Sequence, residues 1–287
     1  MKALRFAEFG PDVMSVVETP APDAGPGRIR IAVRAAGVGP ADWKTRGGAT
    51  PVPHIPGLDA AGIVDQVGED VRGYQVGDEV FGIAPGGACA EHAVLTHFAR
   101  KPPAMSWPDA AGLPSAAEAA LRAIEILRPA AGDVLLIHGA AGGVGLAAAQ
   151  LARARGLLVA GVAAPEHHER LRAAGVAPVA FGPGLADRLH ALVPDGIDCV
   201  FDTAGTGLAE LIALTGAGDR VVTVAPPGDS GARHLSDAPE RAWHALAEAA
   251  GLFERGDFRL PVERTVPLTQ AHRLGESGGD RLALLLD

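Results

Sequence analysis

The sequence is poor in the residues that build a disulfide scaffold or a cysteine-rich zinc lobe. Its 287 residues contain two cysteines, Cys89 and Cys199, which lie far apart in the chain. Two such cysteines argue against a disulfide framework and against a four-cysteine zinc site. Lysine and tyrosine are scarce too, with three lysines, among them Lys44, and one tyrosine, Tyr74. These two scarcities limit which groups can carry out proton transfer.

Long apolar runs are also absent. No apolar segment reaches the roughly 20 residues that cross a bilayer, and the first residues carry charge too early for a secretory signal. The formal net charge of −9 disfavours nucleic acid and anionic membranes as partners. The length of 287 residues suits two domains that each bury a core, and the 48% of apolar residues indicates a globular protein. We expect a soluble cytoplasmic protein.

One stretch of the chain has the pattern of a nucleotide site. An apolar run stops at the Gly/Ala-rich turn 139–145, and helical spacing then resumes. Strand, turn and helix in this order form the phosphate-binding unit of dinucleotide-binding domains. Gly142 lets the main chain approach phosphates, Gly145 lets the helix pack on the strand, and the helix N-terminus adds partial positive charge. Ala140 stands where the usual first glycine would be, and the alternative is a tight turn between packed elements.

The wider pattern predicts a β-rich domain followed by an α/β domain. In the first part, the expected strands are 28–38, 60–67, 79–83 and 90–95. A helix is expected over 107–127. After it, strands alternate with helices, which implies a parallel sheet covered on both faces. These strands are expected near 134–138, 157–162, 178–181, 197–202 and 220–224.

The last part of the chain is expected to begin with a helix and end with a strand. Asp237 and Glu240 form a capping-box-like start for a helix over 238–255. A short helix near 270–274 and a strand over 282–286 follow, and this tail is expected to rejoin the β-rich domain. The predicted parts are therefore a β-rich domain over 1–107, an α/β domain over 108–256 and a return to the first domain over 257–287.

Five motifs give the chain a resemblance to a known family. They are the segments 39–47 (GPADWKTRG), 55–64 (IPGLDAAGIV), 76–82 (VGDEVFG), 138–145 (HGAAGGVG) and 201–205 (FDTAG). Over nearly its whole length the chain resembles the zinc-independent medium-chain dehydrogenase/reductases, the quinone oxidoreductase or zeta-crystallin group. The resemblance implies a GroES-like, mostly β domain and a Rossmann domain with a doubly wound parallel sheet. It also implies a homodimer, and a cleft between the domains where a nicotinamide meets its substrate.

The zinc ligands of the family's metal-dependent members are missing from this chain. Those members place a cysteine where this chain has 39–40, and a Gly-His-Glu where it has 57–59, so that Asp59 alone remains. Catalytic zinc needs about three protein ligands, and we expect no metal. The remaining histidines of this region are interpreted as ordinary loop or strand-edge residues, namely His54, His92 and His97.

At both ends of the expected cofactor, the chain departs from the family pattern. The family places a threonine and a tyrosine near the nicotinamide, where this chain has Ala119 and Leu121. An NAD site would have an acidic residue at the tip of the second strand of the α/β domain, where 161–164 reads Gly-Val-Ala-Ala. This absence favours NADP. The NADP-specific relatives have a serine and a basic residue where this chain has Ala164 and Glu166.

Only three side chains near this tip are candidates to meet a 2′-phosphate: His167, His168 and Arg170. The alternative is a solvated helix start, at which Glu166 repels an anion. The C-terminal Arg-Gly-Lys of the family also differs here and reads Arg281-Leu282-Ala283. The expected cofactor contacts are Ala140, Ala141, Gly142, Gly143, Val144, Gly145, His167, Arg170, Thr203 and Val224.

Three residues are candidates for the chemistry itself. Lys44 is the first candidate to donate a proton to the developing oxyanion or enolate, because an ammonium can do so and a guanidinium effectively cannot. Asp42 either orients that loop or caps a turn. Glu118 suits general acid/base work if it is buried in the cleft, and is an ordinary helix residue if it faces solvent. His138 and Asp202, at two strand ends, are interpreted mainly as structural.

The leading hypothesis is a zinc-free, NADPH-dependent reductase of a quinone or an α,β-unsaturated carbonyl, acting on a small molecule. The second is a non-redox cyclase, isomerase or lyase on the same fold, with weakened or lost nicotinamide binding. It is motivated by the missing hydroxyls at Ala119 and Leu121 and by Ala164 and Glu166. A third hypothesis is a nucleotide-sensing or interaction protein without catalysis.

Overall fold

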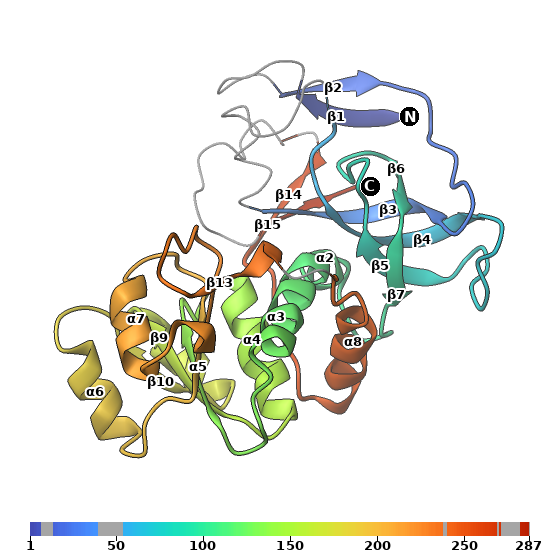
Figure 1. Ribbon diagram of the computed structural model, residues 1–287. Helices are drawn as coiled ribbons and strands as arrows, with labels where there is room; N and C mark the ends of the chain where they lie inside the picture. The colour runs from blue at the N-terminus through green and yellow to red at the C-terminus, as the bar shows by residue number, and fades with distance from the viewer. Residues whose placement is uncertain (7–13, 40–53, 238–239, 269, 271–281, 287) are drawn as a thin grey trace. The chain divides into compact units, whose positions relative to one another are not determined.

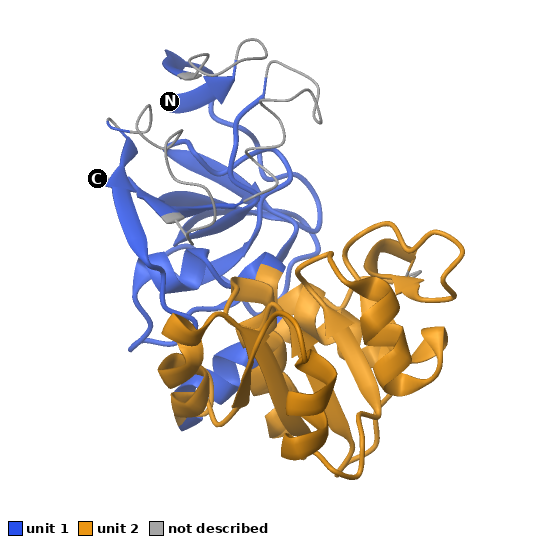
Figure 2. Ribbon diagram, turned by 90° about the vertical axis from the view of Figure 1, so that its left-hand side faces the viewer, with its two compact units in different colours: residues 1–115, 246–255, 260–287 blue, residues 116–245, 256–259 orange. Residues whose placement is uncertain are grey.

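The chain forms two compact units, which are coloured separately in Figure 2. The computed structural model describes residues 1–6, 14–39, 54–237, 240–268, 270 and 282–286. Unit 1 comprises residues 1–115, 246–255 and 260–287, and unit 2 comprises residues 116–245 and 256–259. The domain limits expected from the sequence stay a prediction.

Unit 1 is a GroES-like, mostly β unit. Its main sheet has the strand order β14-β15-β3-β4-β5-β7, with β6 paired to β3, and β1 and β2 form a separate antiparallel pair. Its strands are β1 (Lys2–Phe6), β2 (Met14–Glu18), β3 (Ile29–Val38), β4 (Asp59–Val67), β5 (Glu79–Ile83), β6 (His92–Leu95), β7 (His97–Arg100), β14 (Arg264–Pro267) and β15 (Leu282–Leu285). Its helices are α2 (Trp107–Ala111) and most of α8 (Ala245–Arg255).

The long strand β3 organises the core of unit 1. Apolar residues alternate along its first half, so Ile29, Ile31 and Val33 point to one face and are buried there. The C-terminal strand β15 pairs with β3 in antiparallel register, which places the end of the chain next to its first long strand. Leu284 from β15 is fully buried in the same apolar cluster as Ile31.

Unit 2 is a Rossmann-type unit in which all strand pairs of the sheet are parallel. The strand order is β10-β9-β8-β11-β12-β13, labelled in part in Figure 1. The strands are β8 (Val134–His138), β9 (Leu158–Ala163), β10 (Ala177–Ala180), β11 (Cys199–Asp202), β12 (Val221–Thr223) and β13 (Arg233–His234). The helices are most of α3 (Pro114–Leu127), α4 (Gly143–Ala154), α5 (His168–Ala173), α6 (Leu185–Leu192) and α7 (Leu208–Thr215), with 3-10 turns η1 (Pro165–His167), η2 (Gly218–Arg220) and η3 (Leu235–Asp237).

The alternation of side chains along β8 explains why helices cover both faces of this sheet. Leu136 packs in one apolar cluster with residues of α6 and α7. Leu135 and Ile137 point to the opposite face and are fully buried as well, on the side where α4 packs against β8 and β9. A strand buried on both faces belongs in a parallel sheet, so the sequence expectation of a parallel, doubly covered sheet is confirmed. The strand order reverses between β8 and β11, where doubly wound sheets bind their ligands.

Two helix predictions from the sequence are wrong in their limits. The helix expected over 107–127 is broken into two, because α2 ends at Ala111 with Gly112 as its C-cap, and α3 begins at Pro114. The helix expected over 238–255 begins only at Ala245. Its start is delayed because the Ala242 N–H donates to the Glu118 carboxylate, 3.1 Å away, instead of entering a helical turn. Asp237 belongs to the 3-10 turn η3 and is not the expected helix cap.

The sheet of unit 2 ends at a very short strand. β13 has two residues, and the guanidinium of its Arg233 donates to the carbonyl oxygens of Ile126 and Asp219. Among the described residues, none of the helices has both the length and the apolar composition for a bilayer crossing.

Candidate cofactor site

The glycine-rich turn lies where β8 meets α4, at the carboxyl edge of the unit 2 sheet. Gly139 adopts a left-handed conformation with φ +83°, and the N–H groups of Gly139 and Ala140 donate to the Val162 carbonyl of β9 at 3.1 and 3.0 Å. Gly142 then serves as the N-cap of α4 without any side-chain cap. The turn is thus tied to the neighbouring strand before the helix begins.

The first turn of α4 presents free amides. The first N–H groups of a helix have no intrahelical partner, and the first helical bond here runs from Leu146 N–H to the Gly142 carbonyl. In the described part of the chain, no acceptor is found for the N–H groups of Gly143, Val144 and Gly145. Such amides, together with the helix dipole, form an anion site.

The two glycines of this turn have different steric roles. A Cβ on Gly145 would lie 2.8 Å from the Cα of Ala140, and it would also collide with the Gly139 carbonyl oxygen, so α4 packs here directly on the turn. A Cβ on Gly142 would meet only the Gly139 oxygen, at 3.5 Å. The space beside Gly142 is therefore open to a ligand, and these residues fit the diphosphate of a dinucleotide.

Ala140, at the place of the usual first glycine, is fully buried. Its methyl group faces Gly161 of β9, where an added Cβ would lie only 2.8 Å away. The glycine needed for this close approach is therefore on the neighbouring strand. Since the Ala140 N–H already donates to Val162, this residue offers a ligand neither its side chain nor its amide.

A second turn, which follows β11, is bonded to the first. The hydroxyl of Thr203 donates to the carbonyls of His138, 2.8 Å away, and Gly139, 3.1 Å away. Asp202, the last residue of β11, accepts a bond from the His138 ring at 2.9 Å. The side chains of Asp202 and His138 are buried, and the His138 ring stacks on Phe181. Thr203 thus reaches the glycine-rich turn through its hydroxyl.

Asp202 stays ionised in this buried place. Burial by itself raises the pKa of its carboxyl group, but hydrogen bonds from His138, Thr223 and Gly205 more than offset that effect and bring the pKa below its usual value. A carboxylate only accepts, so Nδ1 of His138 is the protonated nitrogen.

Val224 follows β12 at the same edge of the sheet. Its N–H donates to the Asp202 carbonyl at 3.1 Å, and its carbonyl lies 3.2 Å from Nε2 of His234. Val224 is 40% exposed and therefore accessible.

The tip of β9 is arranged quite differently. Ala163 ends the strand, and the exposed Glu166 and His167 lie in the turn η1. The ring of His168 turns back to the Ala163 carbonyl at 3.1 Å, and Arg170 is half-buried on α5. The region after this tip thus contains two histidines, the basic Arg170 and the acidic Glu166, and no carboxylate lies at the strand end itself.

Glu118 is buried, so its interpretation as a solvent-facing helix residue is wrong. The residue is 2% exposed, and its carboxylate is 2.8 Å from Nε of Arg122 and 3.4 Å from Nη1 of Arg241. Burial lowers the pKa of Arg122, while Glu118 opposes that shift. Sequence reasoning missed both arginine partners, although the i,i+4 spacing of Glu118 and Arg122 pointed to one of them.

The other chemical candidates, Asp42 and Lys44, lie outside the described residues, as does Arg281. The roles of Asp42 and Lys44 therefore stay predictions.

Three described residues of unit 1 that could ligate a metal have partners within the protein. The Asp59 carboxylate accepts the Ser115 N–H at 3.2 Å, in the first turn of α3. His92 pairs with Asp65 at 2.8 Å, and His54 stacks on Phe6. Over the described ranges, no three or more metal-ligating side chains gather in one place.

A hollow of about 350 Å³ lies elsewhere on unit 2. Its lining mixes basic residues such as Arg128 and His234 with acidic residues such as Glu125 and Glu240. None of the candidate cofactor residues lines it.

Comparison with known proteins finds a matching family model for each of the two parts of the chain. The family model "alcohol dehydrogenase GroES-like domain" matches residues 25–106, and the model "zinc-binding dehydrogenase" matches residues 143–241. The quinone oxidoreductase of Mus musculus is 35% identical, over 78% of this chain and 73% of that protein. The solved quinone oxidoreductase of Coxiella burnetii superposes with a TM-score of 0.81 at 29% identity, over 100% of this chain and 99% of the other.

Two further relatives carry more specific names. A 2-methylene-furan-3-one reductase of Solanum lycopersicum is 33% identical, over 79% of this chain and 64% of that protein. A spectinabilin polyketide synthase system protein of Streptomyces orinoci is 35% identical over 91% of this chain, which spans only 13% of that relative. The same sequence pattern therefore occurs in separate reductases and inside a much longer protein.

Proposed function

Because the chain belongs to the quinone oxidoreductase group of the medium-chain dehydrogenase/reductase family, we propose that it is a zinc-free, NADPH-dependent reductase of a quinone or an α,β-unsaturated carbonyl. The observation that carries this proposal is the turn at the start of α4, where three amides without acceptors lie next to the open side of Gly142. Gly143, Val144 and Gly145 would hold the diphosphate through these amides.

One observation supports NADPH over NADH. The tip of β9 ends in Ala163 and Ala164, so no carboxylate there would accept the ribose hydroxyls of NAD. His167 and Arg170 would face the 2′-phosphate of NADP, against the repulsion from Glu166. Thr203 and Val224 would contact the part of the cofactor that extends past β11 and β12.

The chemistry divides between the cofactor and the chain. When bound, the nicotinamide supplies a hydride to an electron-poor carbon of the substrate. In our proposal, Lys44 donates a proton to the oxygen that becomes negative, and Asp42 orients the loop of Lys44. The furanone reductase among the relatives is named for a ketone conjugated to a carbon–carbon double bond, which supports an α,β-unsaturated carbonyl as substrate.

A second candidate function is a non-redox cyclase, isomerase or lyase on this fold. Leu121, at the place of the family's tyrosine, is fully buried, and Ala119 has no hydroxyl to offer the nicotinamide amide.

The homodimer and the cytoplasmic location expected from the sequence also remain predictions.

Separate titrations of the protein with NADPH and NADH, by fluorescence or calorimetry, test the proposal. Tight binding of NADPH, followed by its oxidation when a model quinone or an enone is added, is the expected result. Binding of NADPH without oxidation by any such acceptor would favour the non-redox candidate. No binding of either nucleotide at millimolar concentration would contradict the proposal.

A further inference from the structure

The buried carboxylate of Asp202 accepts hydrogen bonds at the place where the glycine-rich turn and the turn after β11 meet. Asp202 is fully buried at the tip of β11. It accepts the His138 ring N–H at 2.9 Å and the Thr223 hydroxyl at 2.7 Å. The N–H groups of Ala204 and Gly205 donate to the same carboxylate at 3.0 and 2.9 Å. Four donors therefore converge on one ionised group.

These bonds fix both strands that enter the site. The bond from the His138 ring holds the end of β8, and the two amide bonds shape the turn after β11. The turn after β11 packs closely against the start of the glycine-rich turn. A Cβ added to Gly139 would lie only 2.5 Å from the Thr203 hydroxyl oxygen. Gly139 and Ala140 in turn set the direction in which α4 begins. Asp202 is thus connected to the free amides of α4 in two steps: first through His138 and the turn at Thr203, and then through Gly139 and Ala140.

We propose that Asp202 is a positioning residue, whose carboxylate holds the glycine-rich turn in the form that presents its amides to a diphosphate. The binding part of this inference rests on the proposed function, whereas the ordering of the turn does not. Asp202 itself would touch no ligand and acts through His138 and Thr203. Hydrogen bonds to a charged group are about twice as strong as neutral ones, so an amide in its place should loosen the turn.

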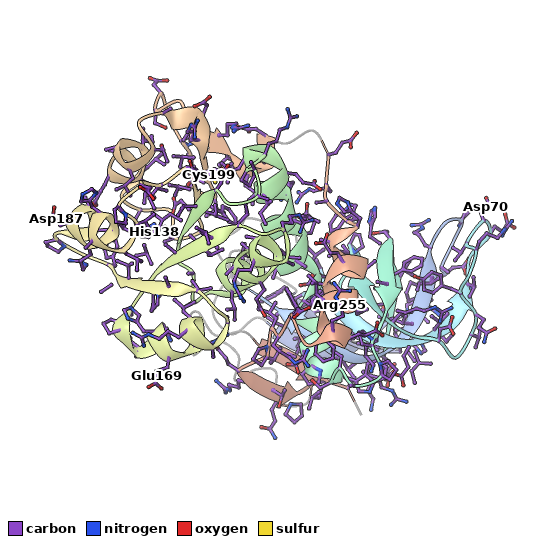
Figure 3. All side chains as sticks on the ribbon, turned by 90° about the horizontal axis from the view of Figure 1, so that it is seen from below. Asp70, His138, Glu169, Asp187, Cys199 and Arg255 are labelled. Carbon is purple, nitrogen blue, oxygen red and sulfur yellow. The ribbon has the colours of Figure 1, made fainter. Side chains whose placement is uncertain are left out.

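The chain contains a matched control at the other end of the same two strands. Asp198 directly precedes β11, and its carboxylate accepts the N–H of Val134, the first residue of β8, at 2.8 Å. Asp198 and Asp202 therefore cross-link β11 to β8 at opposite edges of the sheet. Figure 3 labels His138, the last residue of β8, and Cys199, the first residue of β11.

The experiment compares Asp202→Asn with Asp198→Asn in the full chain. Hydrogen–deuterium exchange without nucleotide, resolved to single amides, should show faster exchange at Gly139, Ala140 and Gly142 in Asp202→Asn only. Asp198→Asn should show faster exchange at Val134 instead. The dissociation constant for NADPH should rise roughly tenfold in Asp202→Asn and stay within about twofold in Asp198→Asn.

The outcomes separate this inference from the proposed function. Unchanged exchange over 139–142 in Asp202→Asn would overturn the inference, as would equal NADPH affinities of the two variants when the wild type binds. If the wild type binds neither NADPH nor NADH, the proposed function fails, and the exchange comparison still decides the role of Asp202. If Asp202→Asn does not fold, Thr223→Val keeps the carboxylate, removes one of its bonds, and should give the same exchange pattern at smaller size.

Discussion

The two ends of the candidate cofactor site differ in how strongly the fold fixes them. The glycine-rich turn is held by β9, by the turn after β11 and by the buried Asp202. The tip of β9, by contrast, continues into an exposed turn with Glu166 and His167 side by side. The end that any dinucleotide needs is built from backbone and buried contacts. In our proposal, the end that distinguishes NADPH from NADH depends instead on a few side chains at the tip of β9, among them the exposed His167 and Glu166.

The largest effect is expected at the fixed end. In Gly145→Ala, the new methyl group collides with backbone atoms of Gly139 and Ala140, which should cost about 1–3 kcal/mol of stability and abolish NADPH binding. Thermal unfolding and a fluorescence titration measure both effects.

Gly142→Ala is the matched control, because its methyl group meets nothing closer than 3.5 Å and its φ of −68° suits alanine. It should keep the wild-type melting temperature while NADPH affinity falls. Equal melting temperatures for the two variants would contradict the close approach at Gly145.

The next largest effect is expected at Lys44, which belongs to neither end of the cofactor site. Its variant separates cofactor binding from the chemical step. If Lys44 is the proton donor, Lys44→Met should lower kcat by roughly 10² or more with nearly unchanged NADPH affinity. Steady-state kinetics and a binding titration check this. Lys101→Met is a useful contrast, because Lys101 is paired with Glu79 and should affect stability rather than turnover. A wild-type rate in Lys44→Met would remove this residue from the mechanism.

Glu118 lies at neither end of the cofactor site, and its variants test whether its role is structural or chemical. Removing one partner of a buried ion pair is strongly destabilising, so Glu118→Ala should lower the free energy of unfolding by about 3 kcal/mol without changing NADPH affinity. Urea unfolding measures this loss.

Glu118→Gln, which keeps the shape and can still accept the Ala242 N–H, should be less destabilised and keep its turnover. A stable Glu118→Gln with strongly reduced kcat would instead assign general acid/base work to this residue.

The smallest effects are expected at the variable end. Arg170→Gln should weaken NADPH binding by a few-fold and leave NADH binding unchanged, because only NADPH carries the 2′-phosphate. Glu166→Gln should strengthen NADPH binding by a similar factor, and both effects should shrink at high salt.

Glu169→Gln, a change at another exposed acidic residue on α5, is the control for net charge. If all three variants change NADPH and NADH affinity alike, the tip of β9 does not select the nucleotide.

Much of the fold could be predicted from the sequence, because its signals are local. The apolar run at Val134 and the glycines at 142 and 145 mark a strand, a turn and a helix within a few residues. One error, the break between α2 and α3 at Gly112 and Pro114, was also local, whereas the other arose where a distant residue decides the outcome. The late start of α8 depends on Glu118, far away in sequence, which takes the Ala242 N–H.

The candidate site shows the same division. The phosphate-binding turn was visible in the sequence, but the reason that Ala140 is tolerated was not, since it lies in Gly161 on the next strand. Likewise, Asp202 looked like one more strand-end residue. Only the parallel pairing of β11 with β8 brings it to His138.

The two-residue strand β13 has a consequence for assembly. An outer strand normally exposes a row of unpaired peptide groups on which another polypeptide can add a strand. Here that row is almost as short as it can be, and the side chain of Arg233 saturates nearby carbonyl oxygens. At this rim of the sheet, a strand from a neighbouring molecule would find only two residues to pair with, so continuation of the ladder is disfavoured here.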